Sequence, residues 1–312
     1  MPPEQISISP PESQYDARLI DAKTGTPLTI EELARRLADT DVVVVGEYHG
    51  HHASHLLQAR LQQALFDRNP RQVLTMEQFN ADRQEVLNHF MAGDIGETEM
   101  IEDAGAWDNY RASYRPLVEF ARRNRLPVIA ANAPAKIVRC VGRKGPDYLK
   151  TLPPETRELL PETAFLDTPA YKEKFVEAIG GSHGVEDGEL SERMRNTYHA
   201  QLLRDNTMAK AILDARTSHP GHQILHTTGT FHSEERLGTV AVLEQRAPEL
   251  SIAVITPVFW PDDEANLPLA THRSGGDYLY FIQPLPEEFQ DPEREREAMR
   301  ARFANRTSPD CD

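Results

Sequence analysis

The stretch that decides the fold is Val42-Val43-Val44-Val45-Gly46-Glu47-Tyr48-His49-Gly50-His51-His52. Four consecutive β-branched residues are typical of a strand that is buried on both faces, as in a parallel sheet covered by helices. The polar residues begin where this strand ends. Ligands of open α/β sheets bind in the crevice beyond the carboxyl ends of the strands. The chain geometry therefore places Glu47 and His49 at a ligand-binding edge.

Composition limits the classes of function. The chain has 312 residues and a formal charge of -15, from 49 acidic and 34 basic side chains. This balance argues against nucleic-acid binding, because contacts with phosphates need a basic face. There is no run of about 20 apolar residues and no basic-then-apolar leader, so we expect neither a membrane span nor a signal peptide. Cys140 and Cys311 make no disulfide framework, and we interpret them as a coincidental pair of thiols rather than a single bridge.

Strand-length apolar runs recur along the chain, at 42–45, 73–76, 127–131, 223–228, 251–255 and 278–282. Stretches with helical periodicity separate several of these runs, which is the rhythm of βαβ units and a parallel sheet. From 134 to about 215 only helical stretches occur. We therefore predict an α/β fold with a mainly parallel sheet, divided into a discontinuous core domain, a small all-helical subdomain and flexible or peripheral tails: 16–133 with 216–285, 134–215, and 1–15 with 286–312.

A repeated motif is the sharpest functional signal. Gly46-Glu47-Tyr48-His49 and Gly229-Thr230-Phe231-His232 each follow a predicted strand, and a third strand ends in Glu77. Glycine lets the backbone turn sharply at a strand end, so that each histidine can point back over the sheet edge. Two imidazoles and two carboxylates over one crevice suit Zn, Mn or Fe. The predicted metal ligands are Glu47, His49, Glu77 and His232.

Further histidines and tyrosines allow two interpretations each. His52 and His55 are three residues apart on a predicted helix and share a face. They either extend a metal or haem site or form a solvated first turn. A tyrosinate can be an axial ligand to ferric haem, which makes Tyr48 and Tyr114 candidate ligands. Packing with the hydroxyl at the surface is the alternative for each tyrosine.

Six segments, taken in order, carry a family resemblance: 42–49, 76–79, 114–117, 126–132, 203–209 and 229–232. Together they resemble the ChaN-like haem-binding lipoproteins, which are grouped with the Tiki proteases, the TraB proteins and the erythromycin esterases. The resemblance extends from about residue 15 to 258. It implies a parallel sheet flanked by helices, with a small helical domain.

The resemblance also implies a function. It implies a role in bacterial iron uptake, with haem bound at a dimer interface and a tyrosine as iron ligand. Tyr48 and Tyr114 are the candidates for this ligand, and His49, His52 and His232 are further candidate haem-binding residues. A location on the periplasmic side of the cell envelope follows from the lipid anchor of the family, which this chain does not itself encode. In metal-dependent relatives, the ion would take the four residues named above.

We derive two main hypotheses. In the first, the protein is not an enzyme but holds haem or an iron complex at the carboxyl edge of the sheet, in a homodimer. In the second, it is a metal-dependent hydrolase, in which the ion activates water and Glu47 or Glu77 is the general base. A scaffold with a residual site is a third possibility. Motifs of serine hydrolases, P-loop proteins and dinucleotide-binding proteins do not occur in the sequence.

Overall fold

The computed structural model describes residues 8–178, 185–186, 189–261, 269–304 and 311. Their centre is a seven-stranded sheet with the order β1-β9-β8-β2-β7-β3-β4. The strands are β1 (Arg18–Asp21), β2 (Val42–Glu47), β3 (Gln72–Asn80), β4 (Val128–Asn132), β7 (Gln223–Gly229), β8 (Ile252–Phe259) and β9 (Tyr278–Ile282). All neighbours are parallel except β1, which pairs antiparallel with β9 at the edge. The predicted α/β fold is confirmed, whereas β1 is an addition, because two apolar residues are too few for a readable pattern.

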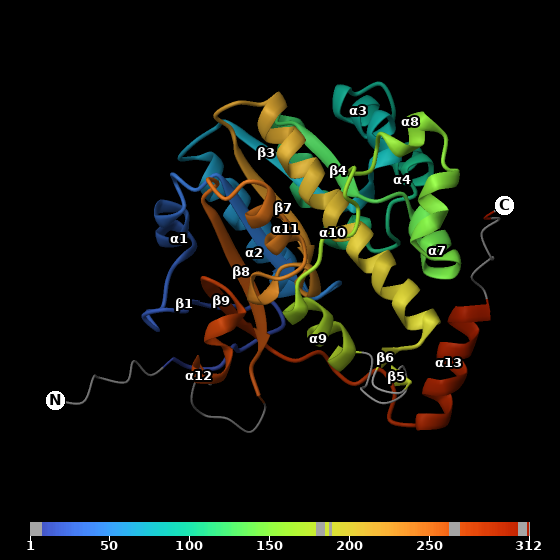
Figure 1. Ribbon diagram of the computed structural model, residues 1–312. Coiled ribbons are helices and arrows are strands. Elements are labelled where there is room, and N and C mark those ends of the chain that lie inside the picture. Colours follow the sequence, from blue (N-terminus) through green and yellow to red (C-terminus); the bar gives the residue numbers. More distant parts are fainter. Residues whose placement is uncertain (1–7, 179–184, 187–188, 262–268, 305–310, 312) are drawn as a thin grey trace.

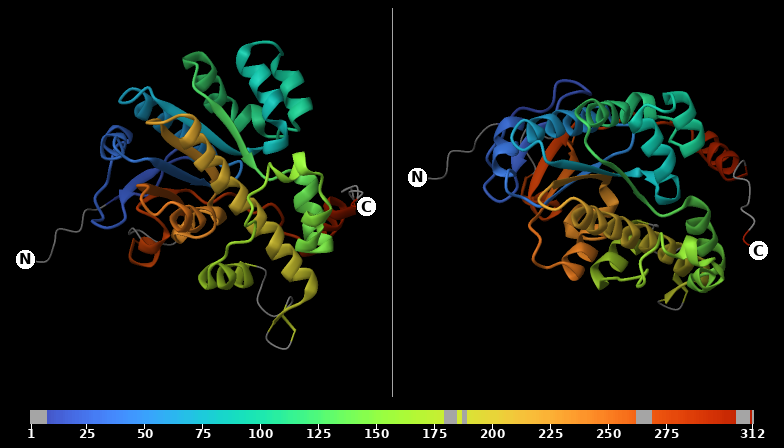
Figure 2. Two further views of the ribbon diagram at one scale, coloured as in Figure 1. Left: turned by 45° about the horizontal axis from the view of Figure 1, so that its top comes forward. Right: turned by 90° about the horizontal axis from the view of Figure 1, so that it is seen from above.

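Helices cover both faces of this sheet (Figures 1 and 2). The α-helices of the described residues are α1 (Ile30–Arg36), α2 (His52–Phe66), α3 (Gln84–Ala92), α4 (Glu97–Ala104), α5 (Tyr110–Ser113), α6 (Arg115–Asn124), α7 (Ala135–Lys144), α8 (Pro154–Arg157), α9 (Pro169–Ala178), α10 (Glu192–Ser218), α11 (Thr239–Arg246), α12 (Leu269–His272) and α13 (Pro292–Ala304). The layer with α1 to α6 lies on one side of the sheet and α10 with α11 on the other (Figure 2).

The valine run of β2 contributes to both cores. Val43 and Val45 pack into the core under α1 to α6, while Val42 and Val44 pack into the core under α10 and α11. Successive side chains of a strand point to opposite faces. Because both faces are covered, every position must be apolar, and the strand shows no hydrophobic alternation.

The segment 134–215 is not entirely helical. A small antiparallel hairpin joins β5 (Val185–Glu186) and β6 (Glu189–Leu190), where we predicted helices alone. Two-residue strands are too short to leave a periodic pattern. In addition, the 27-residue α10 packs against β3, β4 and β7 as well as against α7, so this helix is shared between the inserted segment and the sheet.

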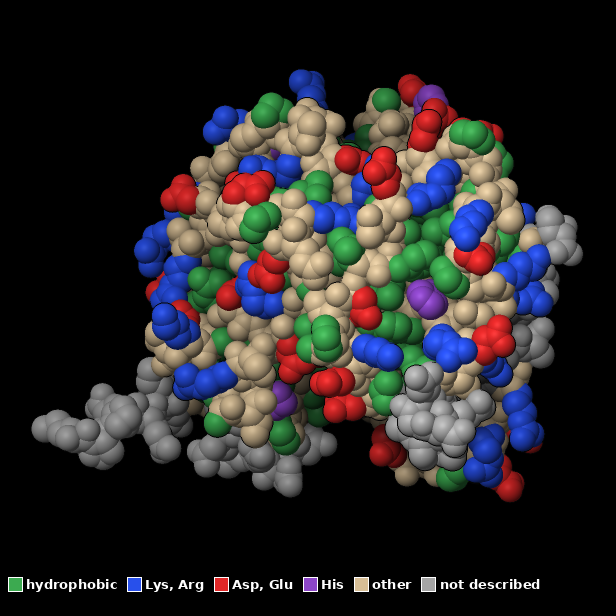
Figure 3. All heavy atoms as spheres, viewed as in Figure 1, with side chains coloured by type: hydrophobic (Ala, Val, Ile, Leu, Met, Phe, Trp, Pro, Cys, Tyr) green, Lys and Arg blue, Asp and Glu red, His purple; other side chains and the backbone are tan. Residues whose placement is uncertain are grey.

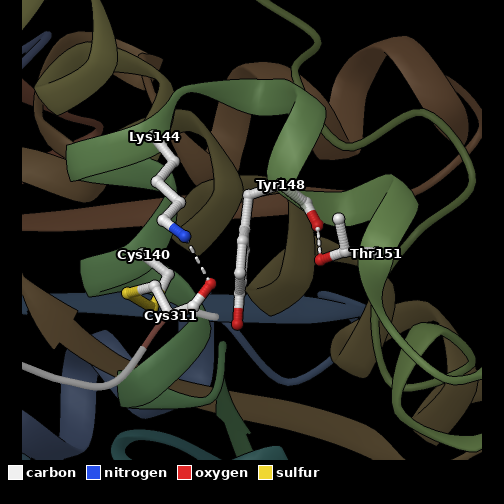
Figure 4. Close-up of a disulfide and its surroundings, with 5 residues drawn as sticks. All are labelled: Cys140, Lys144, Tyr148, Thr151 and Cys311. Carbon is white, nitrogen blue, oxygen red and sulfur yellow. Dashed lines mark hydrogen bonds between the residues drawn. A yellow bond between two sulfur atoms is a disulfide. The ribbon is translucent and has the colours of Figure 1, made fainter.

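Cys140 and Cys311 form a disulfide, so the interpretation of two coincidental thiols is wrong (Figure 4). The two residues lie 171 positions apart, and only the folded chain brings their Cα atoms to 5.7 Å. Beside the bridge, Lys144 Nζ donates to the Cys311 carbonyl over 2.7 Å (Figure 4). The bridge fastens the described residue near the carboxyl terminus to α7.

Within the described ranges, no helix combines the length and apolar character that a membrane span requires.

Candidate functional site

Strand register brings the ends of β2, β7 and β3 to one edge of the sheet. Glu47, the last residue of β2, is the register partner of Gly229, the last residue of β7. On the other side of β7, Met76 pairs with Thr227, so Glu77 extends to the same level. The three strand ends therefore meet, as expected for parallel strands.

The two carboxylates nevertheless belong to opposite faces of the sheet. Glu47 continues the side of β2 that carries Val43 and Val45 and faces α2 and α6. Glu77 continues the side of β3 that carries Val73 and faces α10. This separation follows from the two-residue period of strands. Each carboxylate consequently has a hydrogen-bond network of its own.

The network of Glu47 is buried beneath α2 and α6. Tyr114 Oη donates to its Oε1 over 2.6 Å, Gln78 Nε2 donates to the same oxygen over 3.2 Å, and Gln58 Nε2 donates to Oε2 over 2.7 Å. Burial on its own would raise the pKa of Glu47, but the hydrogen bond from His49, nearby imidazoles and the Tyr114 hydroxyl lower it below its usual value. A carboxylate with this many donors is stable as an anion and is a weak base.

The network of Glu77 lies on the α10 side. Its Oε2 accepts the backbone N–H of Gly229 over 2.7 Å and the hydroxyl of Thr228 over 2.8 Å. Its Oε1 lies 3.5 Å from His232 Nε2. Burial opposes the charged form, yet the charges of His232 and His49 and these hydrogen bonds lower the pKa of Glu77 to about 2. Glu77 is thus an anion throughout the physiological range.

His232 is held from its other side by Asp205 of α10. Asp205 Oδ1 lies 2.7 Å from His232 Nδ1 and also accepts the Thr239 hydroxyl over 2.9 Å, while Oδ2 accepts the Tyr171 hydroxyl over 2.6 Å. Burial lowers the pKa of the imidazole, but Asp205 and Glu77 together raise it above its usual value. Both ring nitrogens of His232 therefore face carboxylates, and the ring is buried.

His49 spans the edge between the two networks. Its Nδ1 lies 2.8 Å from Glu47 Oε1, and its side chain is 46% exposed. Its Nε2 lies so close to Gly229 that a Cβ built there would be 2.8 Å away. The backbone of Gly229 has an ordinary φ of -58°, so this glycine is required for the close approach of an imidazole rather than for the sharp turn that we inferred from the motif.

The remaining predicted site residues differ in their exposure and in their contacts. Tyr114 is fully buried on Glu47. Tyr48 stacks on Phe259 with ring centroids 4.1 Å apart, and burial together with the charge of Glu234 raises its pKa to about 12. His52 is exposed and stacks on Tyr15.

His55, in contrast, is a buried part of the Glu47 network. Its Nδ1 donates to Gln58 Oε1 over 3.2 Å, and its Nε2 accepts the Gly50 N–H over 3.2 Å. Burial lowers its pKa, so the neutral ring is favoured. The hydrogen bond from His55 orients Gln58, which in turn donates to Glu47. His55 therefore helps to hold the Glu47 carboxylate in place.

The four predicted metal ligands do not form a metal-binding group as their side chains lie. In the described ranges, no three His, Cys, Asp or Glu residues are arranged to hold an ion. The reason is the separation by face: Glu47 and Glu77 are oriented by protein donors on opposite sides of the sheet. A haem iron needs only an axial ligand, and a half-exposed imidazole with a carboxylate behind it fits that requirement.

Sequence reasoning did not single out Asp205, Gln58 or Gln201. Gln201 Nε2 lies 3.2 Å from His232 Nε2 and precedes Asp205 by one helical turn. The sequence feature that could have indicated Asp205 is the polar run Arg204-Asp205-Asn206. It lies in the middle of a long helix whose residues on both sides of the run are buried and apolar, such as Leu203 and Met208. Polar side chains at such positions are retained where they meet polar partners.

A surface cavity of about 730 Å³ lies elsewhere, between α1 and α2. It is lined by Ile30, Glu31, Arg60, Gln63, Ala64, Asp67 and Arg68, none of which is a predicted site residue. This cavity is therefore separate from the site that the motifs predict.

Comparison with known proteins identifies the family. No curated protein matches the sequence. The structure of ChaN of Campylobacter jejuni with cofacial haem is similar, with a TM-score of 0.65 and 17% identity over 88% of this chain and 100% of that chain. A variant of the erythromycin esterase EreC in its open conformation covers 90% of this chain and 86% of its own, with 13% identity and a TM-score of 0.47. The family model described as haem-binding uptake, Tiki superfamily, ChaN matches residues 33–243, more than half of the chain. The chain belongs to this ChaN family of haem-binding uptake proteins.

Proposed function

We propose that the protein binds haem for iron uptake in the bacterial cell envelope, through His49 at the carboxyl edge of the sheet. The observation that carries this proposal is the pair of a half-exposed imidazole and a buried, ionised carboxylate, with His49 Nδ1 2.8 Å from Glu47 Oε1. Membership in the haem-binding family supplies the ligand class. A bound haem supplies an iron atom that accepts axial ligands from the protein.

Glu47 prepares His49 for this role. An anionic Glu47 accepts a hydrogen bond from Nδ1–H, which leaves the lone pair of the neutral ring on Nε2. The rings of Trp107 and His49 are perpendicular, with their centroids 4.9 Å apart, and this contact limits the rotation of the imidazole. Although burial disfavours the imidazolium, the Glu47 hydrogen bond and the charges of Glu77 and Glu47 raise the pKa of His49. Haem binding through Nε2 should therefore weaken as the pH falls through this raised pKa.

Tyr48 and Tyr114 are less suitable as iron ligands. A tyrosinate is needed for ligation, and burial raises the pKa of both hydroxyl groups. The Tyr114 hydroxyl is in addition committed to Glu47. His232 is also less suitable as an iron ligand, because both of its ring nitrogens lie near carboxylates. His52 is exposed at the start of α2 and remains a candidate for a contact with the haem rim.

Two observations support the cellular setting and the dimer. A disulfide between distant segments is typical of proteins in oxidising compartments such as the periplasm, and Cys140–Cys311 is such a bridge. Tyr15 and Leu285 are 60% and 45% exposed, and the residues before them are bonded, since Gln14 Nε2 donates to the Pro284 carbonyl over 2.9 Å. Tyr15 stacks on His52, and exposed apolar side chains in this part of the surface suit a contact with a second copy.

A metal-dependent hydrolase is the second candidate, favoured by the Asp205–His232 pair. A carboxylate that orients an imidazole is a recurrent part of general-base sites. However, the two proposed bases, Glu47 and Glu77, both have pKa values below the usual range, which makes them poor proton acceptors near neutral pH. Metal analysis of the purified wild type and of His232→Ala tests this second candidate function. A metal-dependent hydrolase requires stoichiometric metal in the wild type and loss of that metal in the variant.

Hemin titration followed by absorption spectroscopy tests the haem proposal. We expect a saturable shift of the haem bands in the wild type, a loss of affinity in His49→Ala, and no change in the control His89→Ala, which removes an exposed imidazole that pairs with Asp94. Light scattering with and without hemin measures dimer formation. A wild-type protein whose haem spectrum equals that of free hemin would refute the proposal.

A further inference from the structure

The turn between α10 and β7 carries two histidines, in the sequence His219-Pro220-Gly221-His222. The N–H of His222 donates to the carbonyl of His219 over 3.1 Å, and Gly221 has a φ of 74°. Proline at the second position and a glycine with positive φ at the third are typical of a type II turn. This turn holds its first and last residues close together.

The two imidazole rings lie beside each other across the turn. Their centroids are 5.5 Å apart, and the ring planes are inclined by 61°. Two imidazoles that bind one ion through nitrogen atoms at about 2.0–2.1 Å have centroids roughly 4.5–5.3 Å apart, for square-planar and tetrahedral ions respectively. A small rotation of these half-buried side chains covers the difference. The turn therefore places both rings where they can chelate one ion.

The ring nitrogens of both histidines have few competing partners. No described residue forms a hydrogen bond with the ring of His219, and His222 has one long contact, from Nδ1 to the Pro220 carbonyl over 3.4 Å. Donation from Nδ1–H to a carbonyl leaves the lone pair of a neutral ring on Nε2. Burial and the charge of His222 lower the pKa of His219, so its ring is neutral near pH 7. Both imidazoles can therefore offer a lone pair to a metal ion.

The charges near the turn are compatible with a cation that carries an anion as co-ligand. Arg216 donates to the His222 carbonyl over 2.7 Å, and Asp41 balances its charge through an ion pair of 2.7 Å. The Arg71 guanidinium is also near, since a Cβ built on Gly221 would lie 3.4 Å from its Nη1. Its charge favours chloride or a carboxylate in the coordination positions that the histidines leave open. On the face shown in Figure 3, Lys and Arg side chains are interspersed with Asp and Glu, and the net charge of -15 attracts cations to the molecule as a whole.

The turn is remote from the strand edge that carries His49. It precedes Gln223, the first residue of β7, whereas the candidate site lies at Gly229, the last residue of the same strand. At about 3.3 Å per residue, the strand separates the two places by roughly 20 Å. A ligand at the turn would therefore not contact the candidate haem site.

We propose that His219 and His222 form a binding site for one divalent transition-metal ion. Imidazole suits Zn²⁺, Ni²⁺ and Cu²⁺, and the affinity of a given nitrogen site is highest for Cu²⁺. The protein supplies two ligands, and water or an anion supplies the others. The site uses no residue of the strand edge, so it does not depend on the proposed haem function.

Titration of the full chain with Cu²⁺, followed by calorimetry and electron paramagnetic resonance, tests this site. We expect one tightly bound equivalent in the wild type, with hyperfine splitting from two nitrogen atoms. His219→Asn and His222→Asn should each weaken this binding roughly 100-fold, because a single imidazole lacks the second, intramolecular ligand. His89→Asn, which replaces an exposed imidazole that pairs with Asp94, is the matched control and should bind copper as the wild type does.

Several results would overturn the inference. These are a wild type without a tightly bound equivalent, splitting from one nitrogen only, or wild-type affinity in either turn variant. Loss of the equivalent in His49→Ala, but not in the turn variants, would place the ion at the strand edge and overturn the inference as well. Asparagine is common in turns, and circular dichroism checks that each variant folds; if one does not, the other decides. Hemin binding in the turn variants should equal that of the wild type, so failure of the haem proposal and failure of this site are distinguishable.

Discussion

Replacing Tyr114 by phenylalanine tests whether Glu47 is held as a buried anion. The variant keeps the aromatic ring, so it creates no cavity, and it removes only the hydroxyl that donates to Glu47 over 2.6 Å. A hydrogen bond to a charged group contributes about 1.5–3 kcal/mol. We expect the free energy of unfolding to fall by that amount at neutral pH, measured by urea denaturation.

The pH dependence of this loss follows from the lowered pKa of Glu47. A carboxyl group whose pKa is lower in the folded state stabilises the protein above its unfolded pKa, and this contribution disappears as the pH falls through the folded value. The cost of Tyr114→Phe should therefore decrease in acid, toward the value for a neutral hydrogen bond, about 0.5–1.5 kcal/mol.

Tyr110 offers a matched control for this experiment. It is equally buried, but its hydroxyl has no hydrogen-bond partner among the described residues. Because that hydroxyl loses hydration without compensation, Tyr110→Phe should leave the stability unchanged or increase it. If Tyr114→Phe is no more destabilising than Tyr110→Phe at pH 7, the reasoning about the Glu47 network is refuted.

Three further predictions follow from the structure. Replacing Cys140 and Cys311 by serine should lower the free energy of unfolding by about 2–4 kcal/mol, as for other disulfides, and reductant should then have no further effect on the melting temperature. Burial lowers the pKa of His226 to about 4, so between pH 6.5 and 4 the unfolded chain binds a proton that the folded chain excludes. The free energy of unfolding should therefore decline by up to roughly 3 kcal/mol over this range. In urea titrations of His226→Gln this part of the decline should be absent, and a pH profile equal to that of the wild type would contradict the prediction. Gly229→Ala should fold normally but displace the ring of His49, so hemin affinity should fall without a matching loss of melting temperature.

The parts of the fold that could be read from the sequence are those with a regular period. Val42 to Val45 indicated a doubly covered parallel strand, and β2 is the central strand of such a sheet in the structure. The Gly-x-x-His repeat located His49 and His232 at one edge. Residue types at strand ends are visible in the sequence because they interrupt an apolar run.

What the sequence did not reveal depends on contacts between distant segments. The disulfide requires Cys311 to return to α7, and Asp205 reaches His232 only because α10 crosses the sheet. The prediction of one four-ligand cluster neglected the two-residue period of strands, which sends Glu47 and Glu77 to opposite faces. Unlike the disulfide, this separation can be derived from the sequence. Side chains alternate between the two faces along each strand, so Glu47 shares the face of Val45 and Glu77 shares the face of Val73.

The most direct test of the central claim is electron paramagnetic resonance of the ferric haem complex in the wild type, His49→Ala, Tyr48→Phe and Tyr114→Phe. We predict that His49→Ala alone changes the signal of the iron, because the proposed function assigns the protein ligand of the iron to Nε2 of this imidazole. A signal that is the same in His49→Ala and the wild type, but altered in either tyrosine variant, would contradict the account.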